Sequence, residues 1–172
     1  KYWEITQIFL NICKDYSPYV ELFSLDEVFI DISPTEHLFG SRYRIIDLIK
    51  KRIKEEIGEY ITVSVGLSHN KLLAKLASGM NKPNAYPPVP GFGRRGFVEV
   101  SFGNVERVYS QVKLTDFCGI GERIALRLEK IGIHTPLQLR SASLDVLIEE
   151  FKDIEGHFLK NLGLGVDDSE VV

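Results

Sequence analysis

Apolar positions recur with helical spacing in three stretches of the first half of the chain. Residues 2–14 are predicted to form a helix with one apolar stripe. That stripe consists of Ile5, Ile8, Phe9 and Ile12. Residues 41–57 are predicted to form a second helix, which Gly58 ends. Its apolar face consists of Ile45, Ile46, Leu48, Ile49, Ile53 and Ile57.

The third helical stretch follows the first two and carries two stripes. Ser68 is the expected N-cap, and Pro83 is expected to stop the helix. Its buried face consists of Leu72, Leu73, Leu76 and Met80. A second, basic stripe consists of Lys71, Lys75, Ser78 and Lys82. A line of ammonium groups suits a polyphosphate or a nucleic-acid backbone, and an exposed lysine face is the alternative interpretation.

Strand-like segments lie between these helices. Residues 19–23 and 27–33 flank a polar bend near Ser24–Asp26 and predict a β-hairpin. Residues 61–67 alternate strictly between apolar and small side chains, which predicts a strand with room for a close neighbour on one face. A short strand is expected near residues 97–100. The order of elements predicts an α+β fold, a mostly antiparallel sheet with helices on one face.

The second half of the chain is predicted to be helical. The segment rich in Pro and Gly between residues 85 and 96 suggests a boundary, with one domain at 1–100 and another at 101–172. Gly119 and Gly121 allow a sharp turn directly before a helix, whose first N–H groups favour an anion. This pattern indicates a helix–hairpin–helix that holds a nucleic-acid phosphate without reading bases. A plain helical hairpin is the alternative.

Cap signals mark the last helices of the chain. Thr135 begins a capping box with Pro136 in the first helical position. Ser143 is expected to cap a helix that ends at Phe151, and residues 155–162 are expected to form the last helix.

Composition narrows the function classes. The net charge of −3 argues against nucleic-acid binding through overall charge, so any such contact must come from local patches. No apolar run is long enough to span a membrane, and the N-terminus does not resemble a signal peptide, which favours an intracellular protein. Cys13 and Cys118 are expected to be buried free thiols. Because the chain lacks an initiator Met, it is expected to be a fragment or a shortened form of a longer protein.

The candidate chemistry lies in the hairpin bend. Asp26 and Glu27 are adjacent carboxylates at the head of an apolar run. Two carboxylates in one small space repel each other unless a cation lies between them. Mg²⁺ prefers such oxygen ligands together with substrate phosphates. A solvated turn is the alternative. On the helix at 41–57, the basic residues are interpreted as a solvated surface; they are Lys50, Lys51, Arg52 and Lys54.

Together these motifs resemble the Y-family, or translesion, DNA polymerases over nearly the whole chain. The residues Ser24-Leu25-Asp26-Glu27 match the S-x-D-E motif of that family's palm domain. The run at 64–84, which ends with Lys82-Pro83-Asn84, matches its second palm motif. Gly119-Ile120-Gly121 matches its thumb. The resemblance implies a partial palm followed by a small all-α helix–hairpin–helix thumb.

The resemblance also implies roles for individual residues. Asp26 and Glu27 would be catalytic residues and ligands of two Mg²⁺ ions, or of Mn²⁺. Lys82 would contact the triphosphate of the incoming nucleotide. The DNA-binding residues would be Gly119, Ile120, Gly121, Lys75 and Lys71. The implied partners are primer–template DNA, deoxynucleoside triphosphates and a sliding clamp reached through missing C-terminal sequence, with no membrane. The implied location is the cytoplasm with DNA, or the nucleus in a eukaryote.

Departures from the family pattern qualify the resemblance. A strand with another metal-binding Asp, and the fingers domain, would lie before Lys1, and a further DNA-binding domain would follow Val172. The expected function is therefore that of part of a translesion DNA polymerase that is inactive as this isolated chain. Two alternatives stay open. One is a non-catalytic helix–hairpin–helix DNA-binding module in DNA repair. The other is a helix–hairpin–helix repair protein with an unrelated α+β domain.

Overall fold

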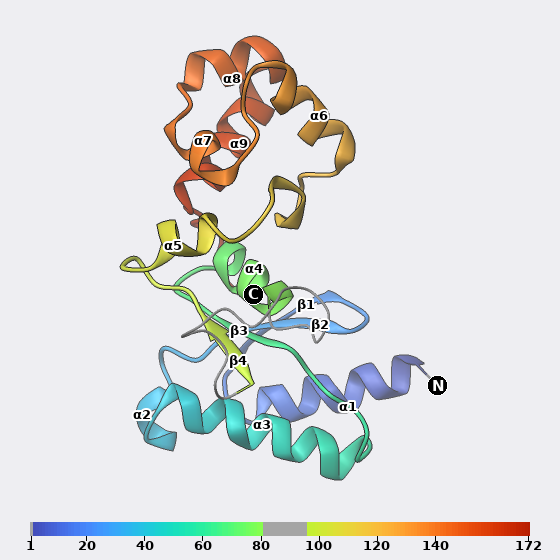
Figure 1. Cartoon of the computed structure of the whole chain (residues 1–172). Helices are drawn as coiled ribbons and strands as arrows, with labels where there is room; N and C mark the ends of the chain where they lie inside the picture. The colour runs from blue at the N-terminus through green and yellow to red at the C-terminus, as the bar shows by residue number, and fades with distance from the viewer. Residues whose placement is uncertain (1, 81–95) are drawn as a thin grey trace. The chain divides into compact units, whose positions relative to one another are not determined.

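The chain divides into two compact units, each described here by itself. The computed structural model describes residues 2–80 and 96–172 (Figure 1). Unit 1 contains residues 1–63 and 170–172, and unit 2 contains residues 64–169. The predicted boundary near residue 100 does not coincide with the limits of these units, so the division into domains at 1–100 and 101–172 stays a prediction. The elements combine helices with short strands, and the predicted α+β class is confirmed.

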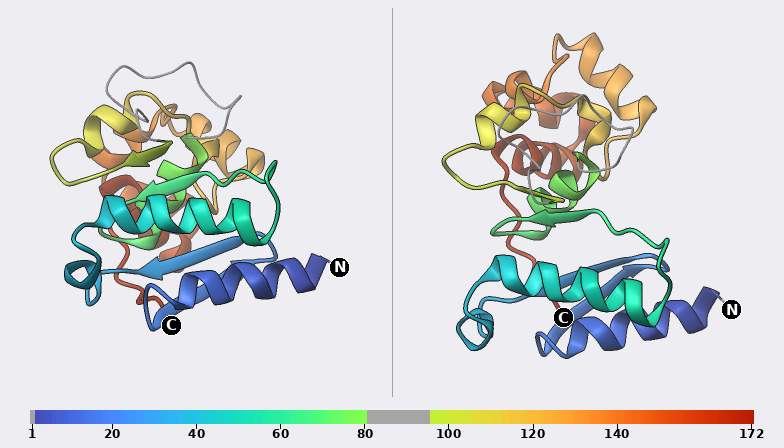
Figure 2. Two further views of the ribbon diagram at one scale, coloured as in Figure 1. Left: turned by 90° about the horizontal axis from the view of Figure 1, so that it is seen from below. Right: turned by 60° about the horizontal axis from the view of Figure 1, so that its bottom comes forward.

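Two long helices of unit 1 pack side by side (Figure 2). Helix α1 spans Tyr2–Lys14, as the apolar spacing predicts. Its buried face is rotated from the predicted stripe, because Thr6 and Leu10 are buried while Ile8 is 38% exposed. Ile12 is fully buried, as predicted.

Helix α3 spans Arg42–Glu56, and the Ser41 hydroxyl accepts a hydrogen bond from the Arg44 N–H at its start. Its buried residues are Ile45, Ile46, Ile49 and Ile53, as predicted. The basic surface is exposed or half-buried and is balanced by acids, because Arg52 pairs with Asp15 at 2.6 Å and Lys51 pairs with Glu55 at 3.7 Å. A short helix α2, Glu36–Phe39, precedes α3 and was not predicted from the sequence.

The predicted hairpin is confirmed. Strand β1, Tyr19–Ser24, pairs antiparallel with β2, Glu27–Asp31. Cluster residues of α1 and α3 such as Ile12, Ile45 and Ile53 form the core of unit 1, and Ile30 of β2 packs against them. Unit 1 is therefore a hairpin covered by helices.

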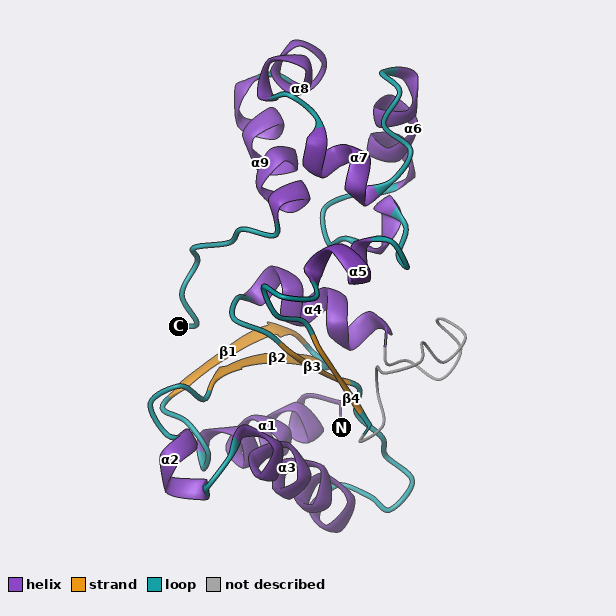
Figure 3. Cartoon of the chain, turned by 60° about the vertical axis from the view of Figure 1, so that its left-hand side comes forward, coloured by secondary structure: helices purple, strands orange, loops and turns teal. Residues whose placement is uncertain are grey.

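In unit 2 the strand predicted over residues 61–67 is shorter than expected. Only Val65–Leu67 forms a strand, β3, which pairs parallel with β4, Phe97–Glu99 (Figure 3). The predicted mostly antiparallel sheet is therefore correct for β1 and β2 and wrong for this pair. The room predicted beside the small residues is occupied by α4, Lys71–Met80, because a Cβ on Gly66 would lie 2.0 Å from the Ala74 carbonyl oxygen.

The predicted N-cap of α4 is wrong. Ser68 lies outside the helix, and its hydroxyl donates to the Val100 carbonyl at 2.7 Å. The Asn70 side chain instead accepts a hydrogen bond from the Leu73 N–H at 2.9 Å. On the buried face Leu73 and Leu76 are buried, whereas Leu72 and Met80 are half-buried and pack against the core. The expected stop at Pro83 lies outside the described residues.

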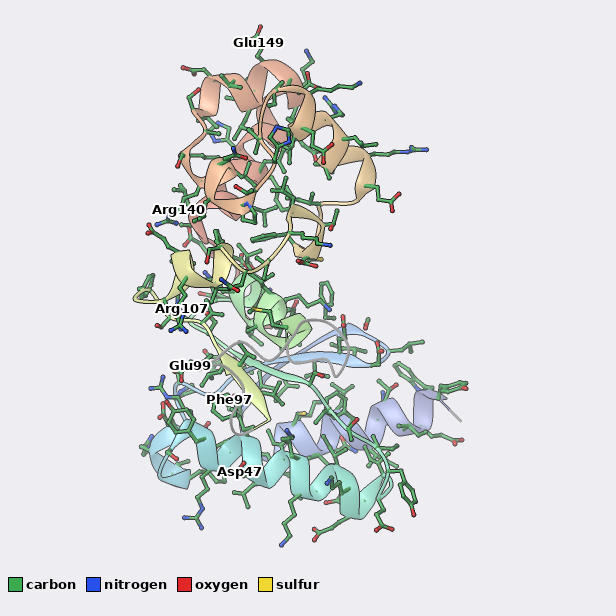
Figure 4. The ribbon with its side chains drawn as sticks, viewed as in Figure 1. Asp47, Phe97, Glu99, Arg107, Arg140 and Glu149 are labelled. Carbon is green, nitrogen blue, oxygen red and sulfur yellow. The ribbon has the colours of Figure 1, made fainter. Side chains whose placement is uncertain are left out.

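The remaining helices of unit 2 largely follow their cap signals. Helix α7, Pro136–Ser141, begins with the predicted capping box at Thr135 and Gln138. Helix α8 is Leu144–Phe151, capped by Ser143, and α9 is Asp153–Leu164, longer than predicted. Arg140 of α7, labelled in Figure 4, pairs with Glu106 at 3.3 Å. Glu106 lies on α5, Val105–Tyr109, which the sequence left unassigned.

The two cysteines differ in burial. Cys13 is buried as predicted, but Cys118 is exposed, so the prediction of two buried thiols is wrong for the second. Cys118 directly precedes Gly119 in an exposed turn. Among the described residues, no helix is long and apolar enough to cross a membrane.

Candidate active site and nucleic-acid interface

The hairpin of unit 1 ends in a two-residue turn that carries the candidate carboxylates. Ser24 pairs with Glu27, which leaves Leu25 and Asp26 as the turn. The strand register shifts between Leu22 and Ser24. Asp26 is exposed, and Glu27, the first residue of β2, is half-buried. The bend therefore lies where the polar residues predicted it.

The turn has an unusual backbone for so short a hairpin loop. Two-residue hairpin loops normally use turns with positive φ, and Gly or Asn supplies it. Within residues 2–80 and 96–172, Lys152 is the one non-glycine residue with positive φ, so neither Leu25 nor Asp26 adopts that geometry. The local sequence thus does not specify a preferred turn.

Two hydroxyl groups hold this turn. The Ser24 hydroxyl donates to a carboxylate oxygen of Asp26 at 2.7 Å. The Thr6 hydroxyl, from α1, donates to the Leu25 carbonyl oxygen at 2.7 Å. Thr6 could not be found from the sequence, because a threonine beside an apolar stripe carries no signal of a partner 19 residues away.

The donor set of the turn suits a hard divalent cation. Both groups are carboxylates, and Mg²⁺ in proteins is bound through one or two carboxylates together with water and phosphate oxygens. In the part of the chain that the structure describes, no group of three or more His, Cys, Asp or Glu side chains is arranged to hold a metal ion. Asp26 and Glu27 therefore fit as partial ligands, with other oxygens completing the coordination.

The basic stripe of unit 2 is only partly described. Lys71 and Lys75 lie on α4 and are half-buried. The positive charge of Lys71 acts on Asp167, a carboxylate that also accepts a hydrogen bond from the Leu72 N–H at 3.1 Å. Lys82, predicted to bind the nucleotide, lies outside the described residues. Asp167 is a second residue that sequence reasoning missed, since it meets α4 from the far end of the chain.

Two glycines lie in the turn before α6, Glu122–Lys130, and they differ in backbone conformation and in surroundings. Gly119 has φ +97°, and a Cβ there would lie 2.7 Å from the Phe158 ring. Gly121 is the N-cap of α6, has φ −83°, and a Cβ there would meet no atom of the described residues within 4 Å. Gly119 is thus required by conformation and by packing, whereas the space over Gly121 is open to an approaching group.

The predicted DNA contact at Ile120 needs a distinction between side chain and backbone. The side chain is 2% exposed and belongs to the core of unit 2. Its N–H donates to the Phe117 carbonyl oxygen at 3.0 Å. The N–H groups of the first turn of α6 have no acceptor within the helix. They are the better placed donors for an anion at this turn.

Comparison with known proteins identifies relatives along the whole chain. Residues 1–79 match the family described as IMS, the impB/mucB/samB family. A DNA polymerase IV of Pelotomaculum thermopropionicum is 38% identical over 162 residues, which is 94% of this chain and 37% of that protein. A DNA polymerase IV of Pseudomonas syringae pv. tomato is 35% identical over 99% of this chain and 44% of that protein.

Solved structures show the same fold. A Y-family DNA polymerase chimera matches with a TM-score of 0.80 and 23% identity, over 99% of this chain and 46% of that one. DinB from Sulfolobus solfataricus matches with a TM-score of 0.78 and 23% identity, also over 99% of this chain and 46% of that one. The chain therefore spans less than half the length of the relatives that it matches.

Proposed function

We propose, from the premise that the chain belongs to the Y family of DNA polymerases, that it forms part of a DNA-directed DNA polymerase for translesion synthesis and DNA repair. The observation that carries this proposal is the hairpin turn of unit 1, which presents Asp26 beside Glu27. In this proposal both are catalytic residues and metal ligands. Residues 64–100 would complete this part of the palm, and the helices after them would form the thumb.

The two carboxylates would hold divalent cations, Mg²⁺ or Mn²⁺. When bound, a pair of such ions neutralises charge on the attacking and leaving oxygens of a phosphoryl transfer. The protein's part is then positioning and electrostatic complementarity. Asp26, exposed at the tip of the turn, would face the ions directly. Ser24 donates a hydrogen bond to one carboxylate oxygen of Asp26, which fixes the orientation of that side chain.

The substrates follow from this assignment. Lys82 would neutralise the triphosphate of a deoxynucleoside triphosphate, and Lys71 and Lys75 would contact DNA phosphates. The turn at Gly119 and Gly121, with the first N–H groups of α6, would hold a DNA backbone phosphate as a helix–hairpin–helix. The proposed partners are primer–template DNA and, in the longer protein, a sliding clamp. The proposed location is the cytoplasm with DNA, or the nucleus in a eukaryote.

Substitution of the turn carboxylates tests the catalytic proposal. In the natural protein that contains this sequence, Asp26→Asn removes the charge that holds the cations and should lower the rate about 10³-fold or more. Glu27→Gln should also be severe. Lys82→Ala removes one point charge from a polyphosphate that metal ions already neutralise in part, so the loss should be roughly tenfold to a hundredfold.

Single-nucleotide incorporation on an undamaged primer–template measures this ranking. Near-normal turnover in Asp26→Asn, together with loss of activity in Lys82→Ala, would show that the turn is not the metal site. A second outcome is that the protein binds DNA and that none of the three substitutions changes any activity. That outcome would favour the non-catalytic DNA-binding module.

The thumb assignment predicts weak DNA binding that does not depend on sequence. Gly121→Thr keeps a favourable N-cap but fills the open space, so it should weaken binding by blocking the phosphate. Gly121→Ser is the smaller control. Fluorescence anisotropy of a labelled duplex at several salt concentrations is the measurement, because phosphate contacts weaken as salt rises. Equal affinity of wild type and Gly121→Thr at low salt would count against this contact.

A further inference from the structure

We propose that Thr6 is a positioning residue for the metal-binding turn. Its hydroxyl, through one hydrogen bond to the Leu25 carbonyl, holds the turn in the conformation that presents Asp26 and Glu27 to a divalent cation. This inference rests on the proposed function of those two carboxylates. It adds a residue of α1 that lies outside the motif.

The first support is the burial and bonding of Thr6. The side chain is 3% exposed, one of the few buried polar residues in the described part of the chain. Its hydroxyl has a single hydrogen to donate. The Leu25 carbonyl oxygen lies at 2.7 Å, and the Tyr2 carbonyl oxygen, one helical turn back, lies at 3.1 Å. The shorter contact identifies Leu25 as the main acceptor.

The second support is that, in the described residues, the Thr6 bond reaches the turn backbone, whereas the Ser24 hydroxyl bonds the Asp26 carboxylate. The turn backbone lacks the positive φ that short hairpin loops prefer. The Leu25 side chain is 62% exposed and Asp26 is exposed, so burial of turn side chains does not anchor it. A hydrogen bond to the carbonyl immediately before Asp26 is therefore a direct constraint on the backbone that carries both carboxylates.

Other hydroxyl groups of unit 1 also donate to backbone carbonyls of distant residues, which provides a comparison for Thr6. The Ser17 hydroxyl donates to the Asp31 carbonyl at the opposite end of the hairpin. The Thr35 hydroxyl donates to the Tyr16 carbonyl at 2.6 Å. Thr35 thus makes the same kind of bond as Thr6 but away from the turn. It supplies a matched control for the loss of one threonine hydroxyl.

Metal binding to the 172-residue chain tests the role of Thr6. Mn²⁺ is titrated, and paramagnetic broadening of the amide NMR signals of residues 24–28 is followed. Thr6→Val keeps the shape but removes the hydroxyl, and should raise the Mn²⁺ concentration for half-maximal broadening by roughly tenfold, as for other groups that orient metal ligands. Thr6→Ser keeps the hydroxyl and should stay within about twofold of wild type, below the roughly tenfold loss expected when such a group is removed. Thr35→Val should leave broadening unchanged.

The outcomes separate this inference from the function on which it rests. Normal Mn²⁺ binding by Thr6→Val, or equal loss in Thr6→Ser and Thr6→Val, overturns the role of the hydroxyl while the metal site stands. No broadening in wild type, or full broadening in Asp26→Asn, overturns the metal site itself and this proposal with it. If Thr6→Val gives no folded spectrum, Thr6→Ala takes its place with the same expected loss, and normal binding by that variant is equally contrary.

Discussion

The glycine turn shows how two residues of one type can have different reasons for being there. Gly119 has a positive φ and lies against Phe158, so any side chain there is strained and crowded. Gly121 has an ordinary φ and open space around it. A loss of DNA binding on substitution of Gly119 could therefore reflect damage to the fold. The same loss at Gly121 reports on the contact itself.

The two cysteines are also expected to differ in their reactivity toward thiol reagents. Burial raises the pKa of Cys13 to about 12, although the charge of Arg52 opposes this, and its side chain is fully buried. Cys118 is exposed. We expect a thiol reagent such as DTNB at pH 8 to modify Cys118 alone in the native chain, and both residues in urea. Cys118→Ser should abolish the native reaction, and rapid modification of that variant would contradict the burial of Cys13.

At the scale of elements, two side chains cap the N-terminus of α4. Asn70 directly precedes the helix, and Asp167 comes from the far end of the chain. Asn70 accepts a hydrogen bond from the Leu73 N–H, and its side-chain amide donates to the Gly165 carbonyl at 2.9 Å. Asp167 accepts from the Leu72 N–H. A carboxylate at a helix N-terminus is favourable, because it meets the positive end of the helix dipole. The segment after α9 therefore stabilises a helix some 95 residues earlier.

This cap predicts a pH dependence of stability. Burial raises the pKa of Asp167, but hydrogen bonds from the Ser169 hydroxyl and from the Ser169 and Leu72 N–H groups together lower it below its ordinary value of 3.8. A depressed pKa stabilises the fold above the unfolded pKa, and the stabilisation disappears as pH falls through the folded pKa. Asp167→Asn should thus lower the free energy of unfolding by about 1 kcal/mol at pH 7.

Urea unfolding between pH 7 and pH 3 checks this expectation. The difference between wild type and Asp167→Asn should shrink as the carboxylate becomes protonated. Asp168→Asn, at the exposed neighbouring position, should change little at any pH. A constant difference for Asp167→Asn across this range would mean that the negative charge does not matter.

At the scale of the whole molecule, each compact unit has its own hydrophobic core. The core of unit 1 includes Ile12, Ile45 and Ile53. The core of unit 2 is continuous. It contains Leu73 of α4, Val98 of β4 and Leu147 of α8. Arg127 on α6 also holds the helical part of unit 2 together, because it pairs with Glu150 at 2.8 Å and covers the Phe151 ring.

Separate cores predict separate responses to a cavity. Leu147 is fully buried, so Leu147→Ala should cost about 2–5 kcal/mol. Native-state hydrogen exchange should then accelerate within residues 64–169 and change little in α1 and α3. Ile53→Ala should have the reverse pattern. Equal acceleration in both units for either variant would show that the two cores unfold together.

The sequence by itself determined the features that depend on near neighbours. Helix α1, the capping box at Thr135, the hairpin bend and the turn at Gly119 all rest on side-chain periodicity or on hydrogen bonds within a few residues. The candidate carboxylates are adjacent in the chain, so the motif placed them together before any fold was known. The resemblance to the Y-family DNA polymerases came from the same short motifs.

Tertiary structure alone decided what distant segments do to one another. The strand β3 pairs in parallel with β4, about thirty residues away, and no local pattern encodes that partner. The N-terminus of α4 is capped by Asn70 and by the distant Asp167. Ser68 does not cap it, because its hydroxyl donates to the Val100 carbonyl. The bond from Thr6 to the carboxylate turn is of this kind too, because a buried hydroxyl takes whichever acceptor the folded chain brings to it.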